Sequence, residues 1–226
     1  YAALEVATTS SNNVAIGRSA LAQNTTASNN TAVGYQAAYS TTTGYNNTSV
    51  GRNSMYANTT GHSNTAFGWN ALTTNSTGTD NTAIGLQALN SNTTASQSTV
   101  VGYQAAYNNT VQTVTAFGWK AGYSQSGGTP GSNTWIGYRA GESATTGGAN
   151  TAIGHDALQE TTTGAYNTAV GSNALQQLTS GTHNTAIGQG SGSSITTGSK
   201  NTIIGGYSGN QGGLDIRTSS NNIVLS

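Results

Sequence analysis

Aromatic side chains recur at one position of this sequence and are candidates for binding sugars. Tyr35, Trp69, Tyr103, Trp119 and Tyr138 each directly follow a glycine that closes a short motif. Flat rings beside Asn and Gln amides can stack on sugar rings and hydrogen-bond their hydroxyl groups, which would suit an attachment protein. The alternative, which we favour, is that the rings pack against one another, because aromatic side chains gain free energy from burial and ring contacts.

The other residues that could do chemistry do not converge. His62, His155 and His183 are scattered, and one acidic neighbour, Asp156, adjoins them. A metal site needs several ligands at compatible spacing, and nucleophilic catalysis needs a nucleophile, a base and an orienting partner. The sequence also contains no Cys. We therefore expect no catalytic residue, no metal and no cofactor, and predict that the protein is not an enzyme.

The aromatic positions belong to a repeat that covers the whole chain. The sequence NTAIG occurs at 81–85, 150–154 and 184–188. Related motifs end at Gly17, Gly34, Gly51 and onwards with a 17-residue period, which becomes irregular only between Gly102 and Gly137. A last, degenerate copy, NIVLS at 222–226, follows after 21 residues and has Ser226 in place of the glycine. Such self-similarity at a fixed period is typical of solenoids, in which each repeat forms one coil.

The letters of the repeat favour strands over helices. The residue before each motif glycine is β-branched or aromatic in all but the last copy, and a small residue and usually Thr precede it. A 3.6-residue apolar stripe is absent, and Gly, Asn and Thr are poor helix formers. The sequence predicts an all-β, parallel β-solenoid of about 13 coils with a 17-residue repeat, forming one domain over residues 1–226. A second extended stretch, ending in Thr-Thr, is expected to complete each coil, and stacked Asn side chains are expected to hydrogen-bond between coils.

Strand alternation predicts two faces, because successive side chains point to opposite sides. Thr and the Ile, Val or Phe share one face, and Ala takes the other. We expect the Ala column to face outward and to pack against other copies of the chain, since a long apolar strip is rarely exposed. The two assignments could be exchanged, and the need for a partner would remain. The predicted core ladder is Ile16, Val33, Val50, Phe67, Ile84, Val101, Phe117, Ile136, Ile153, Val170, Ile187 and Ile204. The predicted oligomer face is Ala15, Ala32, Ala66, Ala83, Ala116, Ala152, Ala169 and Ala186.

Composition limits the partners. Only 5% of the residues are charged, and six basic and six acidic residues cancel without forming a run of either sign. Nucleic-acid binding requires a basic surface, and a membrane span requires a long apolar segment. We expect neither nucleic acid as a partner nor membrane insertion.

The motif N-T-A-[IV]-G, once per coil, resembles the N-S-V-A-I-G repeat of trimeric autotransporter adhesin heads. The pattern T-A-[IV]-G-x-x-A-L is also similar to repeats of phage tail fibres and related bacterial surface fibres. The resemblance implies a left-handed parallel β-roll, a side-by-side homotrimer, and an extracellular, cell-surface or virion location. Two features differ from the adhesin heads: the period is longer here, and Thr often replaces their first Val.

Together these patterns predict a non-catalytic structural or adhesive segment of a longer fibre. Its expected partners are copies of itself, in a homotrimer or filament, and cell-surface glycans. The alternative is an ice-binding β-solenoid that orders water on flat Thr ladders, such as Thr42/Thr43, Thr59/Thr60 and Thr162/Thr163.

Three further features of the sequence are interpreted as structural. Residues 212–226 are expected to be a degenerate terminal coil or an exit towards a following domain. The 19-residue interval from Gly118 to Gly137 contains the only Pro of the sequence, within the segment GGTPGS at 127–132. We interpret this segment as a loop excursion rather than a receptor-binding tip. The N-x-[ST] sequons at Asn24, Asn58, Asn75 and Asn92 occupy equivalent positions and are interpreted as products of the repeat rather than glycosylation sites.

Overall fold

A computed structural model describes residues 2–110, 113–127 and 131–226. The chain is an all-β parallel β-solenoid of about 12 turns with 17-residue spacing, which confirms the fold predicted from the repeat. It divides into two units, residues 1–113 and 114–226, and each is described by itself. The described residues include no helix, and therefore none that could cross a membrane.

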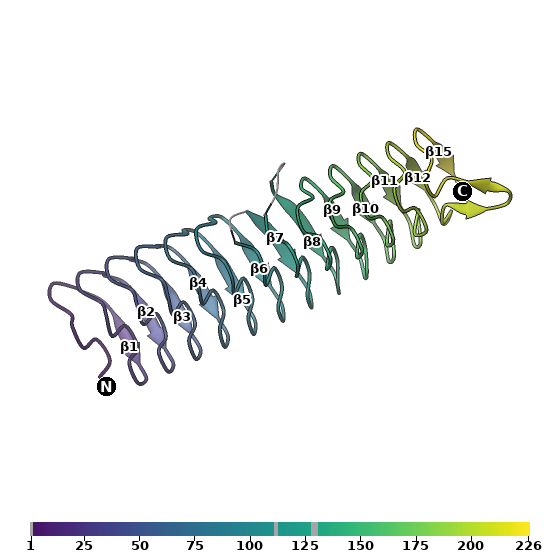
Figure 1. The fold of residues 1–226 in the computed structure, drawn as a ribbon. Coiled ribbons are helices and arrows are strands. Elements are labelled where there is room, and N and C mark those ends of the chain that lie inside the picture. The colour runs from purple at the N-terminus through teal and green to yellow at the C-terminus, as the bar shows by residue number, and fades with distance from the viewer. Residues whose placement is uncertain (1, 111–112, 128–130) are drawn as a thin grey trace. The chain divides into compact units, whose positions relative to one another are not determined.

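Within each unit, one short strand per coil pairs in parallel with the equivalent strand of the next coil (Figure 1). The register is that of the repeat, since Thr31 lies opposite Thr48 and Val33 opposite Val50. The first unit contains β1 (Val14–Ile16), β2 (Thr31–Val33), β3 (Thr48–Val50), β4 (Thr65–Phe67), β5 (Thr82–Ile84) and β6 (Thr99–Val101). The second contains β7 (Val114–Phe117), β8 (Asn133–Ile136), β9 (Thr151–Ile153), β10 (Thr168–Val170), β11 (Thr185–Ile187), β12 (Thr202–Ile204), β13 (Asn210–Gln211), β14 (Leu214–Asp215) and β15 (Ile223–Leu225).

The Asn that opens most motifs is buried and connects three coils. Asn64 Oδ1 accepts the backbone N–H of Asn81 at 3.0 Å, and Asn64 Nδ2 donates to Asn47 Oδ1 at 3.2 Å and to the Gly78 carbonyl at 2.9 Å. The same pattern recurs in the second unit, where Asn167 Oδ1 accepts the backbone N–H of Asn184 at 2.9 Å. The predicted Asn ladder is confirmed, and it explains why the same letter opens nearly every motif.

The glycine that closes each motif lies where neighbouring coils approach most closely. Gly68 has φ +139°, and a Cβ at this position would lie 2.5 Å from the carbonyl oxygen of Gly85 in the next coil. Only glycine suits this position. A residue with a Cβ would be strained at this positive φ, and its Cβ would collide with the backbone of the next coil.

The inner and outer faces of the strands are the reverse of the primary expectation. Thr and the Ile, Val or Phe do share one face, as alternation predicts, but that face points outward. The residues predicted as the oligomer face are interior: Ala15 is partly buried, and Ala32, Ala66, Ala83, Ala116, Ala152, Ala169 and Ala186 are fully buried. The residues predicted as the core ladder are exposed or half-buried on the outside: Ile16, Val33, Val50, Phe67, Ile84, Val101, Phe117, Ile136, Ile153, Val170, Ile187 and Ile204.

The physical reason is that the segment after each motif glycine, which forms the wall opposite the strands, already fills the interior. The third and fourth residues of this opposite wall are buried, as Ala71 and Leu72 are in one coil. Only a small side chain then fits between the walls. The exception supports this account: Trp135 takes the place of Ala in β8, and the opposing wall has Gly122 and Gly141, at which a Cβ would collide with the Trp135 indole.

The opposite wall is a series of turns rather than the second extended stretch that the repeat suggested. Its second and fourth residues adopt left-handed backbone angles, for example Asn70 with φ +56° and Leu72 with φ +52°. Such angles cost on the order of 1–3 kcal/mol each for residues other than glycine. Hydrogen bonds between coils oppose this cost, since Leu72 N–H donates to the Ala88 carbonyl at 3.0 Å.

Residues 212–226 form the end of the last coil. A short antiparallel hairpin of β13 and β14 interrupts this coil, and β15 then returns to pair with β12 in parallel. Ile216 is buried, and the Tyr207 hydroxyl donates to the Leu214 carbonyl at 2.7 Å, which fixes the hairpin to the coil. Residues 128–130 of the GGTPGS segment lie outside the described residues.

Candidate functional site

The outward face of the strands is the most extensive candidate surface in each unit. It carries a column of Thr beside a column of Ile, Val and Phe, and the two columns repeat with every coil. Exposure is 57% for Phe67, 38% for Ile84 and 39% for Ile153. Contiguous apolar surface of this kind marks an interaction site in soluble proteins. The sequence analysis placed these side chains in the core, so this surface was found only from the structure.

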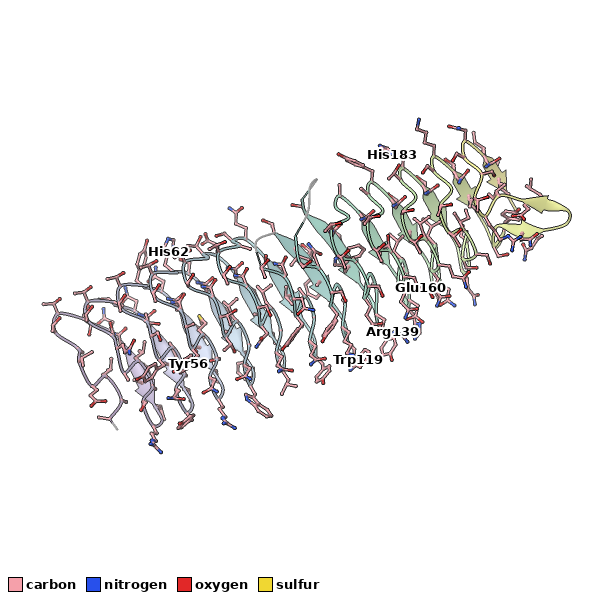
Figure 2. The ribbon with its side chains drawn as sticks, in the orientation of Figure 1. Tyr56, His62, Trp119, Arg139, Glu160 and His183 are labelled. Carbon is pink, nitrogen blue, oxygen red and sulfur yellow. The ribbon has the colours of Figure 1, made fainter. Side chains whose placement is uncertain are left out.

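The position after the motif glycine forms a second, aromatic surface. In the second unit the rings of Trp119 and Tyr138 stack at 4.9 Å between centroids, and those of Tyr138 and His155 stack at 4.7 Å. Figure 2 shows Trp119 and Arg139 projecting from one side of the ribbon. The ring faces that a sugar would need are used by neighbouring rings in this stack, which is the packing that the structural interpretation describes.

In the first unit the same position alternates cations with rings. The Arg52 guanidinium carbon lies 5.8 Å from the centroid of Tyr35 and 5.5 Å from that of Trp69. Arg18 lies 5.8 Å from the Tyr35 centroid. Tyr103, the remaining candidate, is 40% exposed. The structure therefore brings the predicted aromatic residues into rows, and in this unit the rows include arginine.

A charged cluster in the second unit was missed by the sequence analysis. Arg139 Nε donates to Glu142 Oε2 at 2.6 Å and lies 3.7 Å from Asp156 Oδ1, while Lys120 Nζ lies 3.9 Å from Glu142 Oε1. The hydrogen bond to Glu142 raises the pKa of Arg139 further above its ordinary value. The signal in the sequence is the period itself, because Arg139 and Asp156 occupy the same position in successive repeats.

The histidines lie in separate rows. His62 stacks on Tyr45 at 4.7 Å, and His183 stacks on Tyr166 at the same centroid distance. His155 Nδ1 lies 3.2 Å from Asp156 Oδ2. In the part of the chain that the structure describes, no three His, Cys, Asp or Glu side chains come together as metal ligands.

The Thr-Thr ladders have one half-buried and one exposed column. Thr42 Oγ1 donates to the Thr59 carbonyl at 3.2 Å, and Thr162 Oγ1 donates to the Thr179 carbonyl at the same distance. The second Thr of each pair, such as Thr43 or Thr163, is exposed. The hydroxyl group of the first Thr is therefore half-buried and uses its hydrogen for a bond between coils, whereas the second Thr is exposed to water.

The sequon asparagines form a second buried ladder. Asn75 Nδ2 donates to Asn58 Oδ1, and Asn92 Nδ2 donates to Asn75 Oδ1, both at 2.8 Å. Asn24 is equally buried and accepts the Ala27 N–H at 2.9 Å. A glycosylating enzyme cannot reach these amides in the folded protein.

A small hollow near the C-terminal hairpin is lined by Thr196, Asp215, Arg217 and Thr218. Arg217 Nη2 donates to Asp215 Oδ2 at 2.7 Å. This side-chain hydrogen bond lowers the pKa of Asp215 to about 2. The two charges neutralise each other, so the hollow offers no uncompensated charge to a ligand.

Comparison of the chain with protein-family models, with curated proteins and with solved structures gives no match.

Proposed function

We propose that this chain is a non-catalytic structural segment of an extracellular fibre, as in phage tail fibres or microbial surface adhesins. Its coils would associate side by side with other copies of the chain, in a homotrimer or filament, and the fibre would attach to surface glycans. The observation that carries the proposal is the outward column of Ile, Val and Phe, which occurs in both units.

The energetics of this column favour self-association. Full burial of an Ile or Phe side chain contributes roughly 1.5–3 kcal/mol, so covering the exposed part of Ile84 or Phe67 contributes about 1 kcal/mol. The contribution recurs at every coil, because the column repeats with the period. A second copy has the same period and therefore offers a matching column along its whole length.

The contacts of the chemistry-bearing residues support a non-catalytic role. His62 and His183 stack on tyrosines in different rows, and the Asp156 carboxylate lies beside His155 and Arg139. These groups are used in separate contacts, whereas catalysis would require several of them to converge on one reacting atom.

Mass measurement by light scattering tests the proposed association. One chain has a mass of 22.7 kDa, and a homotrimer would have three times this mass. Ile84→Lys and Ile153→Lys place a charge on the outward face and should shift the mass towards one chain while leaving the circular dichroism spectrum unchanged. Thr60→Lys and Thr163→Lys add the same charge at exposed positions away from the strands and should leave the assembly intact. A monomeric wild-type chain would refute the proposal.

Ice binding is the competing function, and the outward Thr column of the strands favours it. Thr65 and Thr82 lie opposite each other on neighbouring strands beside the apolar column. Bulky Phe67 and Phe117 interrupt the flatness that ice contact needs. A thermal hysteresis assay decides between the two functions; we expect none, and a clear hysteresis gap would favour ice binding.

A further inference from the structure

The alternation of arginine and aromatic rings in the first unit forms a candidate ligand site. Its four members follow the motif glycines of successive coils: Arg18, Tyr35, Arg52 and Trp69. The central guanidinium, that of Arg52, lies between two rings, at 5.8 Å from Tyr35 and 5.5 Å from Trp69. Tyr35 in turn lies between two guanidinium groups, since Arg18 is 5.8 Å from the same ring. We call these four residues the arginine ladder.

Stacking prepares Arg52 for an anion. A cation–π contact uses the charge of the guanidinium and leaves its N–H donors able to bind an anion. Contact with a ring on each side also restricts the position of the group, which lowers the entropy lost when a ligand binds. Arg52 is exposed, and no ion pair to it occurs among the described residues.

The second unit shows which group a stacked arginine binds in this fold. Arg139 lies over Tyr138 at 5.9 Å and donates to the carboxylate of Glu142 at 2.6 Å. Lys120 also lies over a ring, that of Trp119, and shares the same carboxylate at 3.9 Å. In that unit the chain supplies its own carboxylate.

Among the described residues of the first unit, no acidic side chain forms an ion pair with Arg52, although Glu5 occupies the same repeat position as Glu142. The only acidic residues of this unit are Glu5 and Asp80, and its only Lys or Arg residues are Arg18 and Arg52. Arg139 lies one position further along its repeat than Arg52, so the comparison is one of chemistry: an external carboxylate can accept from Arg52 as the Glu142 carboxylate accepts from Arg139.

We propose that the arginine ladder binds an acidic polysaccharide, with the Arg52 guanidinium donating to a carboxylate of the polymer. Arg18 and Arg52 are two coils apart, about 9.6 Å along the stack, so they can contact widely spaced charges on one chain. The half-buried Gln36 amide follows Tyr35, and the half-buried Tyr56 phenol is on the coil of Arg52; both suit hydroxyl groups between the charges. The proposal rests on the proposed function, since it names the glycan class that such a fibre would attach to.

Charge density argues for a polysaccharide over nucleic acid. Duplex DNA carries about one negative charge per 1.7 Å, and its affinity depends on neutralising many phosphates. Two guanidinium groups at about 9.6 Å neutralise few of them. A hydroxyl-rich polymer with at most one carboxylate per sugar unit has a lower charge density than DNA, and its hydroxyl groups suit the uncharged polar surroundings of the two cations.

Binding of polygalacturonate, measured by calorimetry at low and physiological salt, tests the proposal. Arg52→Gln should weaken binding roughly tenfold, the effect of losing one charge-assisted hydrogen-bonded contact, and Arg18→Gln combined with Arg52→Gln should abolish it. Lys200→Gln removes the same charge from an exposed site in the second unit and should bind like the wild type. Circular dichroism verifies the fold of each variant, which we expect to be unchanged because the replaced side chains are on the surface.

Neutral dextran and a single-stranded DNA oligomer serve as comparison probes. We expect no binding of dextran and weaker binding of DNA than of polygalacturonate. The proposal is overturned if the wild type binds no polygalacturonate, if the double variant binds it as the wild type does, or if DNA binds more tightly. None of these outcomes alters the mass measurement, so failure of the ligand site and failure of the fibre proposal remain distinguishable.

Discussion

Replacement of Asn64 by Ala is the most direct test of what holds the coils together. The Asn64 side chain makes four hydrogen bonds that connect its own coil to both neighbours. Three of the groups that it contacts keep another partner after truncation: Asn47 Oδ1 still accepts the backbone N–H of residue 64, the Gly78 carbonyl still accepts Asn75 Nδ2, and Asn81 Nδ2 still donates to a carbonyl. The backbone N–H of Asn81 keeps none.

The expected cost follows from this inventory. A buried N–H without a partner costs about 1–3 kcal/mol, and the net loss of the remaining bonds adds roughly 0.5–1.5 kcal/mol. We therefore expect Asn64→Ala to lower the free energy of unfolding of the first unit by about 2–4 kcal/mol. Thr60→Ala, at an exposed position of the same coil, should change it by less than about 0.5 kcal/mol.

Asn64→Asp separates accepting from donating. The carboxylate can still accept the Asn81 N–H, but it cannot donate to Gly78 or Asn47, and burial beside these acceptors raises its pKa in the folded state. A raised folded-state pKa means that the variant is most stable below the ordinary pKa of Asp and loses stability as pH rises through the raised value. The destabilisation relative to wild type should therefore shrink as the solution is acidified.

Urea unfolding at one protein concentration and amide hydrogen exchange measure these effects. Fixed concentration matters because association would itself stabilise the coils. The exchange rate of the Asn81 N–H reports directly on the lost acceptor and should rise in Asn64→Ala. If unfolding free energy and Asn81 exchange both match the wild type, the Asn ladder does not stabilise the stack as argued.

Three further changes test other parts of the fold. Gly68→Ala should destabilise by about 2–6 kcal/mol in urea unfolding, from backbone strain and overpacking together, whereas Gly131→Ala, where a Cβ meets no atom within 4 Å, should be nearly neutral; similar effects would refute the close-approach argument. Trp135→Ala should cost about 3–5 kcal/mol by the same assay because it empties a filled interior, and a smaller loss would mean that the walls collapse onto the space. The pKa of Asp215, followed by NMR, should be about 2 and should rise to the ordinary range in Arg217→Gln; the ion pair's contribution is present above the ordinary pKa and is lost as pH falls through about 2.

The repeat predicts one coil per 17 residues, and strand alternation predicts which side chains share a face. The period does not decide which of the two faces is interior. Alternation places Thr82 and Ile84 together and Ala83 opposite, and this holds in the structure. The inner face is decided by the opposite wall, where Ala88 and Leu89 already occupy the interior.

A signal for the correct assignment was nevertheless present in the letters. Trp135 occurs in the Ala column, and Gly122 and Gly141 replace Leu in the opposing wall. Such compensation in size requires the two columns to face each other across the interior. The left-handed turns of the same wall were harder to recognise, because Leu and Asn occupy these positions in many coils; Gly122 and Gly141, at the fourth position of two coils, were an available indication.

Low charge is a physical consequence of stacking identical coils. Like charges in adjacent coils would lie about 4.8 Å apart and repel by about 0.9 kcal/mol per step even in water. The exceptions obey this constraint: Arg18 and Arg52 are separated by Tyr35, and where cations do follow in adjacent coils, as Lys120 and Arg139 do, Glu142 contacts both. Two guanidinium groups at about 9.6 Å are separated by roughly one Debye length at 0.1 M salt, so they repel little and can share one ligand. The spacing that the stack tolerates is thus also the spacing at which an anionic polymer can bridge the arginine ladder.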